Sequence, residues 1–351
     1  RITFISPLVV YLFTFLGGTG HTIYSLLPVI ADVAKDVGVR PSRPLSVAVI
    51  AAQQAVIASP ISAPTVLVVS LLAPHGVGLL DILKVCLPAT LGGVIVSILV
   101  ANRLGKELHE DAEYLEKIAT VQQAQQPPLQ AYLASASAKR SVALFLLGIS
   151  WIILTGALPH LKPCWEVQGV TRTLGMPTVI EMVMLSVAAL MVLTCQVNPQ
   201  EIARSSVFNT GMQAVISILG ISWLGDTFIS AHKVDLLAHV QAQIVQAPWQ
   251  FSLVLFSMSI VLVSQAATLR AMIPLGLAIG LPTQALLAAL PAVNGVFFIP
   301  NYPTVLAAIN FDKTGTTRVG KWILNHSFMV PGLVATITAV AIAHGLIQVL
   351  F

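Results

Sequence analysis

Two polar, proline-containing segments interrupt long apolar stretches of this sequence, one at residues 59–65 and one at residues 300–304. Proline removes a backbone donor and fixes φ, so a helix that reaches either segment must stop and restart. A restarting helix presents free N–H groups and a partial positive charge, which favour a bound anion. Both segments carry neutral donors, so an anion with two carboxylates could place one at each helix end. The candidate ligands are Ser59, Ser62 and Thr65 in the first segment, Asn301 and Thr304 in the second, and nearby Asn294. Kinked helices with packing hydroxyls are the alternative interpretation.

A second pair of interruptions could wall the same site. Residues 17–21 read Gly-Gly-Thr-Gly-His and residues 264–268 read Ser-Gln-Ala-Ala-Thr, each inside an apolar stretch. Glycine permits unusual dihedrals and a close approach to a ligand, although glycine in a membrane helix also serves packing alone. The binding groups expected here are Thr19, His21, Gln265 and Thr268.

Ionisable side chains within apolar stretches are costly and commonly functional. His21 and Arg270 lie beside the two interruptions, where they could offset the charge of an anion, and His21 could also titrate. Glu181, Asp226 and His326 are further candidates, with the membrane surface as the alternative location for several of them.

The composition indicates that these groups lie in a membrane protein. Of the 351 residues, 56% are apolar and 9% are charged, whereas soluble domains carry about 25% charged residues. The apolar runs are continuous, and the longer ones match the roughly 20 residues of a membrane-spanning helix, so helices are expected rather than a β-barrel. The net charge of +4 is spread among loops, which indicates membrane orientation rather than nucleic-acid binding.

Catalytic and metal-binding patterns do not emerge. Cys86, Cys164 and Cys195 are far apart, without metal or redox spacing, and are expected to be inert buried thiols. No nucleophile elbow, metalloprotease pair or phosphate loop is evident. We therefore expect no enzyme activity, no cofactor and no metal.

The expected elements are helical throughout. Residues 45–58 and 65–72 are each too short to span comfortably, so 45–72 is expected to be a re-entrant hairpin, as is 281–309. The remaining spans or half-spans are expected near 3–16, 21–33, 79–100, 141–158, 177–195, 205–224, 249–263, 268–279 and 322–343, with an amphipathic helix and a flexible linker in 103–140.

The two ends of the chain resemble each other. Pro64-Thr65-Val66-Leu67 recurs as Pro303-Thr304-Val305-Leu306, and Thr22 to Pro28 parallels Thr268 to Pro274 in the same order. This favours an internal repeat, and an odd number of crossings between the hairpins would make the repeat inverted. The predicted fold is an all-α polytopic membrane protein with inverted repeats, broken helices and two re-entrant hairpins.

The predicted organisation has four parts: a first repeat at 1–105, a polar loop at 106–140, connecting spans at 141–247 and a second repeat at 248–351. Cations of the polar stretch, with Arg204, Lys313, Arg318 and Lys321 on the same predicted side, favour a cytoplasmic loop. The chain begins without Met, and we expect earlier spans to precede it.

Six runs of the sequence are distinctive, and they are Phe15 to Ser25, Arg40 to Pro44, Gln53 through Ser62, Pro300 to Pro303, Gly315 to Thr317 and Asn325 to Gly332. These runs are similar to the anaerobic four-carbon dicarboxylate transporters, the Dcu family. The resemblance covers essentially the whole chain, with residues 120–175 the least similar.

The resemblance implies uptake, exchange and efflux of fumarate, succinate, malate and aspartate across the cell inner membrane, typically as fumarate–succinate antiport. It also implies a regulatory membrane sensor as a partner beside the substrate and the lipid bilayer, and a homo-oligomer is compatible with the sequence. Transport of another organic anion such as citrate, an anion channel and an intramembrane enzyme are the alternatives. A channel would need a continuous polar stripe, whereas the polar residues cluster at the breaks.

Overall fold

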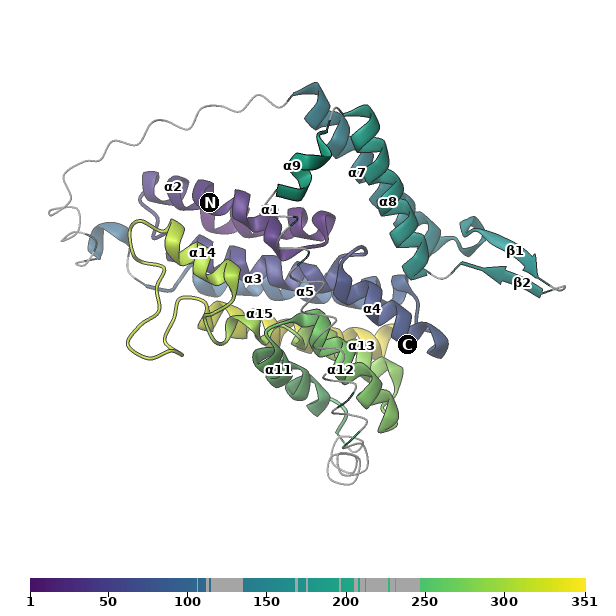
Figure 1. Cartoon of the computed structure of the whole chain (residues 1–351). Helices are drawn as coiled ribbons and strands as arrows, with labels where there is room; N and C mark the ends of the chain where they lie inside the picture. The colour runs from purple at the N-terminus through teal and green to yellow at the C-terminus, as the bar shows by residue number, and fades with distance from the viewer. Residues whose placement is uncertain are drawn as a thin grey trace.

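The computed structural model describes residues 1–105, 107–111, 135–167, 170–174, 176–195, 197–204 and 247–351, with the single residues 114, 208, 212, 227 and 231. The span predicted at 205–224 and the candidate Asp226 lie outside these residues. Helices dominate the described part (Figure 1). Three described helical stretches are long and apolar enough to cross a membrane, and they are Ser42–His75, Leu79–Ala101 and Met329–Leu350.

The elements fall into three groups along the chain. The first group is α1 (Ile2–Gly17), η1 (Gly20–Ser25), α2 (Leu27–Asp36), α3 (Ser42–Ala58), α4 (Ala63–Leu72), η2 (Ala73–His75), α5 (Leu79–Ala101) and η3 (Leu108–Glu110). The second is α7 (Ala136–Ala157), η4 (Pro159–Leu161), β1 (Cys164–Val167), β2 (Val170–Thr173), α8 (Met176–Thr194) and α9 (Pro199–Arg204). The third is α11 (Gln250–Leu262), α12 (Gln265–Ala278), α13 (Thr283–Ala289), η5 (Leu290–Ala292), η6 (Gly295–Phe297), α14 (Pro303–Phe311) and α15 (Met329–Leu350).

The two glycine- and serine-centred breaks are confirmed, and each has a local cause. Helix α1 ends because Gly18 turns left-handed, with φ 67°, and the Thr19 side chain caps η1 by accepting from the His21 N–H. Helix α11 ends at Val263, which also has a left-handed φ of 49°, and Ser264 Oγ then caps α12 by accepting from the Ala267 N–H. A β-branched residue with positive φ is a strained conformation, so the second break is held by its surroundings.

Helices α5 and α15 pack side by side and antiparallel at the centre of the molecule. The Gly93 Cα faces the backbone of Ala335, and Gly92 faces the side chain of Ile342. Ser97 Oγ donates to the Pro331 carbonyl at 2.8 Å. Residue numbers therefore increase along α5 in the direction in which they decrease along α15, so the two helices are antiparallel. Small residues at the contact allow the close approach.

The stretch 42–75 is an interrupted helix that runs on in one direction. Arg43, in the first turn of α3, donates to the carbonyls of Leu104 and Gly105, which follow the C-terminal end of α5. Since α5 is 23 residues long and starts directly after η2, α3 and α4 must together run back along its length. Figure 1 shows α4 continuing onward from α3. The re-entrant hairpin predicted here is therefore not confirmed, because Ser59–Ser62 bends the chain without reversing it.

The stretch 283–311 is likewise interrupted rather than folded back on itself. In Figure 1, α13 lies near the end of the molecule where the C-terminus is marked, and α14 lies at the opposite end, beside α2. Helix α14 packs against η1, α2 and α3, whereas α13 packs against α15 and α11. The second predicted hairpin is also not confirmed, and the two interrupted stretches run in opposite directions.

The middle of the chain holds one feature that the sequence did not suggest. Helices α7 and α8 agree with the spans expected near 141–158 and 177–195, but β1 and β2 form an antiparallel hairpin between them. Cys164 begins β1 and is exposed, unlike the buried Cys86 and Cys195, so its predicted burial was wrong.

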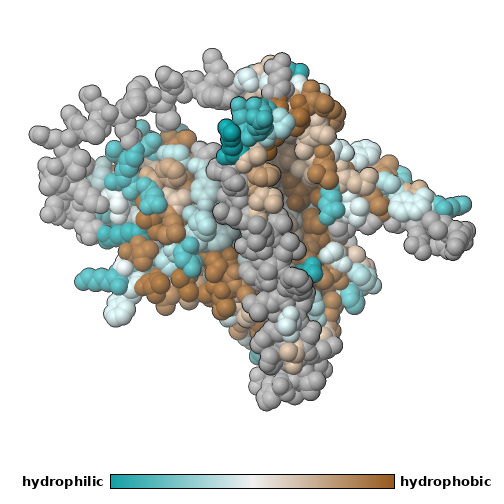
Figure 2. Space-filling view, viewed as in Figure 1, coloured by the Kyte–Doolittle hydropathy of each residue, from teal (hydrophilic) through white to brown (hydrophobic). Residues whose placement is uncertain are grey.

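The last helix begins later than expected. Helix α15 starts at Met329 rather than near 322, because Val319 pairs with His326 in an isolated bridge and residues 320–325 form the turn between them. Figure 2 shows broad hydrophobic surface over the helical body, with hydrophilic residues gathered at α9 and at the end that holds α2.

Candidate functional site

A cluster of amides joins the second break to two other elements. Gln265 is the first residue of α12, and its Nε2 donates to the Gln53 backbone oxygen in α3 and to Asn294 Oδ1, each at 2.9 Å. Asn294, between η5 and η6, is 1% exposed. Two residues predicted from the sequence, Gln265 and Asn294, are thus in direct contact, and α3 is the third wall of the cluster.

Several buried polar atoms of the described residues, in this cluster and elsewhere, lack a hydrogen-bond partner. Gln53 is 3% exposed, and neither its Oε1 nor its Nε2 is paired. Gln54 uses Nε2 to donate to Thr336 Oγ1 at 3.3 Å, but its Oε1 is unpaired. Thr304 Oγ1, at the start of α14, is also buried and unpaired. Buried polar groups are nearly always satisfied, so these atoms mark where a polar ligand or water would bind.

The hydroxyls of the first polar segment, residues 59–65, already form hydrogen bonds inside the protein. Ser59 Oγ donates to the Phe15 carbonyl at 2.6 Å, and this bond fixes the segment 59–65 against the end of α1. Ser62 Oγ caps α4 by accepting from the Thr65 N–H, and Thr65 Oγ1 donates to the Ile57 carbonyl at 3.0 Å. The three side chains therefore build the break, and in this arrangement their protons are not directed at a ligand.

The other predicted residues are divided between buried and exposed positions. The Thr19 hydroxyl lies 3.0 Å from Nδ1 of half-buried His21. Thr268 is buried and donates to the Ser264 carbonyl at 2.7 Å. Asn301 and Arg270 are exposed, so neither joins the amide cluster. Glu181 is exposed on α8, where it belongs to the surface rather than to an interior site.

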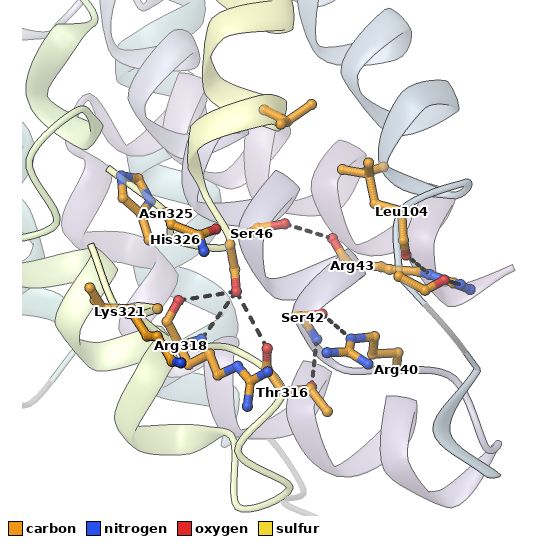
Figure 3. Close-up of a pocket in the computed structure, with 16 residues that line it drawn as sticks. Arg40, Ser42, Arg43, Ser46, Leu104, Thr316, Arg318, Lys321, Asn325 and His326 are labelled. Carbon is orange, nitrogen blue, oxygen red and sulfur yellow. Dashed lines mark hydrogen bonds between the residues drawn. The ribbon is translucent and has the colours of Figure 1, made fainter. Parts of the chain in front are cut away.

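A cationic cavity of about 800 Å³ opens near the start of α3, the end of α5 and the loop before α15 (Figure 3). Its lining is rich in positively charged and polar side chains, and much of it comes from 316–330. The labelled lining residues are Arg40, Ser42, Arg43, Ser46, Leu104, Thr316, Arg318, Lys321, Asn325 and His326. Such a cavity attracts anions.

Two of its arginines are held by the chain that follows α5. Arg43 is 8% exposed and, besides its two carbonyl contacts, pairs with Glu107 Oε1 at 2.6 Å. Arg40 pairs with Asp111 and donates to Ser42 Oγ at 3.1 Å. Arg318 and Lys321, by contrast, have exposed side chains. The cavity therefore has fixed cations on one wall and accessible cations on the other.

His326 lies in this wall as a neutral imidazole. Its Nδ1 accepts from the Phe328 N–H at 3.3 Å, which leaves Nε2 to carry the proton and donate to the Phe298 carbonyl at 3.1 Å. Burial lowers the pKa of His326, and the Phe298 carbonyl opposes this more weakly. At neutral pH His326 therefore adds no charge to the cavity, although the sequence suggested it as an ionisable site residue.

One face of α3 connects the cavity to the amide cluster. Ser46 lines the cavity, and Gln53 lies seven residues later, which is two helical turns and about 10 Å along the axis. Residues seven apart share a helix face. Sequence reasoning missed Gln53 and the cavity as candidate sites. Gln53 could have been found because it is an amide inside the apolar run 45–58. The cavity could have been found from the closely spaced pair Arg40 and Arg43.

Within the described ranges, no group of three His, Cys, Asp or Glu side chains gathers where it could hold a metal ion. The candidate groups are instead the neutral amides of the cluster and, separately, the cations that line the cavity. Such a set can bind an anion by hydrogen bonds and attract it by charge, without fixed counter-charges at the inner end.

Comparison with known proteins agrees with this chemistry. The family model for anaerobic C4-dicarboxylate membrane transporters matches residues 1–351. The C4-dicarboxylate transporter DcuA of Wolinella succinogenes is 40% identical over 342 residues, which cover 97% of this chain and 78% of that protein. DcuA of Escherichia coli K12 is 39% identical over 341 residues, with the same shares. The anaerobic C4-dicarboxylate transporter DcuB of Escherichia coli O6:H1 is 34% identical over 352 residues, covering 95% of this chain and 76% of that protein.

No solved structure matches this chain. The family match nevertheless extends over every residue of the sequence, and three relatives share more than a third of their aligned residues with it. The chain belongs to the family of anaerobic C4-dicarboxylate membrane transporters.

Proposed function

We propose that this protein is a secondary transporter that exchanges four-carbon dicarboxylates across the cell inner membrane by alternating access. The observation that carries the proposal is the amide cluster of half-buried Gln265 with buried Asn294 and Gln53, which joins a broken helix to two other elements. Broken helices that line a polar cavity are the usual form of a binding site in secondary transporters.

The cationic cavity serves as the mouth of the pathway. A dianion is drawn to the cations of the wall formed by Arg318 and Lys321, and it then moves along the α3 face from Ser46 toward Gln53. Neutral donors at the inner end suit a transported substrate, because a strong ion pair in a low dielectric would hold it too tightly to leave. The hydroxyl of Thr304 and the breaks at residues 19–21 and 59–65 complete the proposed walls.

The two halves, 1–105 and 248–351, form an inverted repeat in this proposal. Helix α4 of the first half packs on α12 of the second, whereas α14 of the second packs on η1 and α2 of the first. The antiparallel pair of α5 and α15 would then lie on the pseudo-two-fold axis. Exchange of these crosswise contacts would open the site alternately to the two sides.

Fumarate, succinate, malate and aspartate are the proposed substrates, with fumarate–succinate antiport as the physiological direction. Residues 106–140 would form a cytoplasmic loop and 141–247 the connecting spans. A regulatory membrane sensor and a second copy of the chain are the proposed protein partners.

Counterflow in proteoliposomes tests the proposal. Vesicles loaded with unlabelled succinate should take up labelled fumarate against its gradient, and empty vesicles should not. Citrate inside the vesicles should not drive this uptake. Uptake that is equally fast into empty vesicles would indicate a channel, and drive by citrate alone would indicate a different organic-anion transporter.

A further inference from the structure

Gln53 stands out among the buried polar groups of the described residues. It is the one described side chain with two separate polar atoms, Nε2 and Oε1, that are both buried and both unpaired. An unpaired buried amide destabilises the protein that carries it. A leucine in the same place would fill the volume without this penalty, so the amide is better explained by a ligand than by packing.

The direction of the side chain can be inferred from its neighbour. Gln54 points toward α15, since its Nε2 donates to Thr336 Oγ1. Successive residues of a helix are rotated by about 100°, so Gln53 leaves α3 on another face. That face holds Ser46, which lines the cationic cavity.

The donor group of the Gln265 amide, beside Gln53, is already used inside the protein. Gln265 gives both of its Nε2 protons away, one to the Gln53 backbone oxygen and one to Asn294 Oδ1. Gln265 and Asn294 therefore fix the position of the backbone at Gln53, while the Gln53 side chain keeps its hydrogen-bonding capacity.

We infer that Gln53 determines substrate specificity within the proposed transport site, by forming a hydrogen bond with the substituent on C2 of the dicarboxylate. Its Nε2 donates to a substrate carboxylate, and its Oε1 accepts from the 2-hydroxyl of malate or the 2-ammonium of aspartate. Succinate and fumarate have no donor at C2, so they use only the Nε2 half of the amide. The inference rests on the proposed function, and it adds a residue and a substrate distinction to it.

The test compares substrates within one variant. Full-length wild type, Gln53→Leu and, as a control, Gln284→Leu are reconstituted, and unlabelled malate, aspartate and succinate compete for counterflow of labelled succinate. Gln53→Leu should weaken the binding of malate and aspartate about tenfold more than that of succinate, which corresponds to one additional hydrogen bond to the substrate. Gln284→Leu should leave the affinity ratios unchanged, because Gln284 is an amide at an exposed position of α13.

Stability supplies a second readout. Without substrate, Gln53→Leu should melt at the same temperature as wild type or higher, since an unpaired buried amide has been removed. A Gln53→Leu protein that transports with wild-type substrate ratios would overturn the inference, and so would a marked loss of substrate-free stability, which would mean that the amide is needed by the fold.

Gln53→Met covers the case in which the leucine variant is not inserted. It keeps the length of the side chain and removes both its donor and its acceptor, so the binding of malate and aspartate should again be weakened more than that of succinate. An equal loss for all three substrates would refute the role in specificity. A wild-type protein that exchanges no dicarboxylate would instead refute the proposed function itself, and the wild-type arm reports this separately.

Discussion

The side-chain nitrogen of Gln265 lies 2.9 Å from Asn294 Oδ1 and 2.9 Å from the backbone oxygen of Gln53. One amide group thus joins the first turn of α12, the irregular chain before α14 and the middle of α3. These elements belong to both ends of the sequence. Only the bond to Gln53 joins the two halves of the sequence, so in the proposed alternating-access mechanism a movement of one half against the other would act on this bond.

Gln265→Leu should both destabilise the protein and impair transport. Asn294 Oδ1 would lose its donor inside the protein, and an unsatisfied buried group costs about 1–3 kcal/mol; the link to the Gln53 backbone oxygen would also be lost. Thermal unfolding in detergent and succinate counterflow measure the two effects. Gln284→Leu, at an exposed position of α13, is the matched control and should change neither. Unaltered stability in Gln265→Leu would contradict the observed contacts.

Arg43→Gln should lower the stability of the protein more than Glu107→Gln does, although the two residues form one ion pair. Arg43 is 8% exposed and also donates to the carbonyls of Leu104 and Gly105, so its loss should cost at least the 1.5–3 kcal/mol of one charged hydrogen bond. Glu107 is 43% exposed, and its loss should cost less than about 1 kcal/mol. Equal unfolding temperatures for the two variants would show that the carbonyl contacts contribute little.

The sequence predicted the helices and their breaks well, because glycine, serine and proline act locally. Gly18 and Ser264 stop or cap helices through their own backbone and side-chain geometry, and both positions were identified. Whether a break reverses the chain is decided by distant contacts. The hydrogen bonds from Arg43 to Leu104 and Gly105 join residues about 60 positions apart, so no local pattern could indicate that α3 and α4 run on in one direction.

Gly93→Ala should destabilise the protein, whereas Gly345→Ala should not. A Cβ at Gly93 would lie 3.0 Å from the Ala339 Cβ and closer still to the backbone of Ala335, so α5 and α15 would have to separate. Overpacking of this kind costs about 1–3 kcal/mol. A Cβ at Gly345 meets nothing within 4 Å, and alanine there should be neutral or stabilising by up to about 1 kcal/mol. Unfolding temperatures of the two variants provide the comparison.

Native Cys164 should react with an impermeant maleimide added to intact cells. It is exposed in β1 between α7 and α8, and a cytoplasmic polar loop before α7 would put this hairpin on the outer side. Cys86 and Cys195 are buried and should stay unlabelled until the protein is unfolded. A cysteine introduced at position 321 should label only after the cells are opened. The reverse pattern would invert the predicted orientation.

The binding residues were harder to predict than the helices. Ser59, Ser62 and Thr65 were chosen because hydroxyls beside proline resemble ligands, but the same hydroxyls satisfy backbone carbonyls and cap α4. Gln265 and Asn294 were both named as candidates, and the structure brings them into contact, while their role in binding stays a prediction. Gln53 was missed although it is an amide in an apolar helix, because the sequence does not show whether such a side chain finds a partner after folding.

Lys321→Gln should raise the KM for dicarboxylates at low salt and leave kcat nearly unchanged. Lys321 lies at the exposed wall of the cationic cavity, where its charge speeds the approach of a dianion without touching the amide cluster. Clefts of one sign raise association rates by about 10-fold or more in total, so one of several cations should account for a few-fold change. The effect should fade as ionic strength rises, because the screening length falls from roughly 10 Å at 0.1 M to 3 Å at 1 M.

Lys84 provides the control, because it is exposed near the start of α5 and thus lies at the opposite end of that helix from the cavity. Uptake into vesicles of known orientation at several salt concentrations measures the effect, and a KM shift that persists at 1 M salt, or that Lys84→Gln reproduces, would argue against electrostatic capture at this cavity.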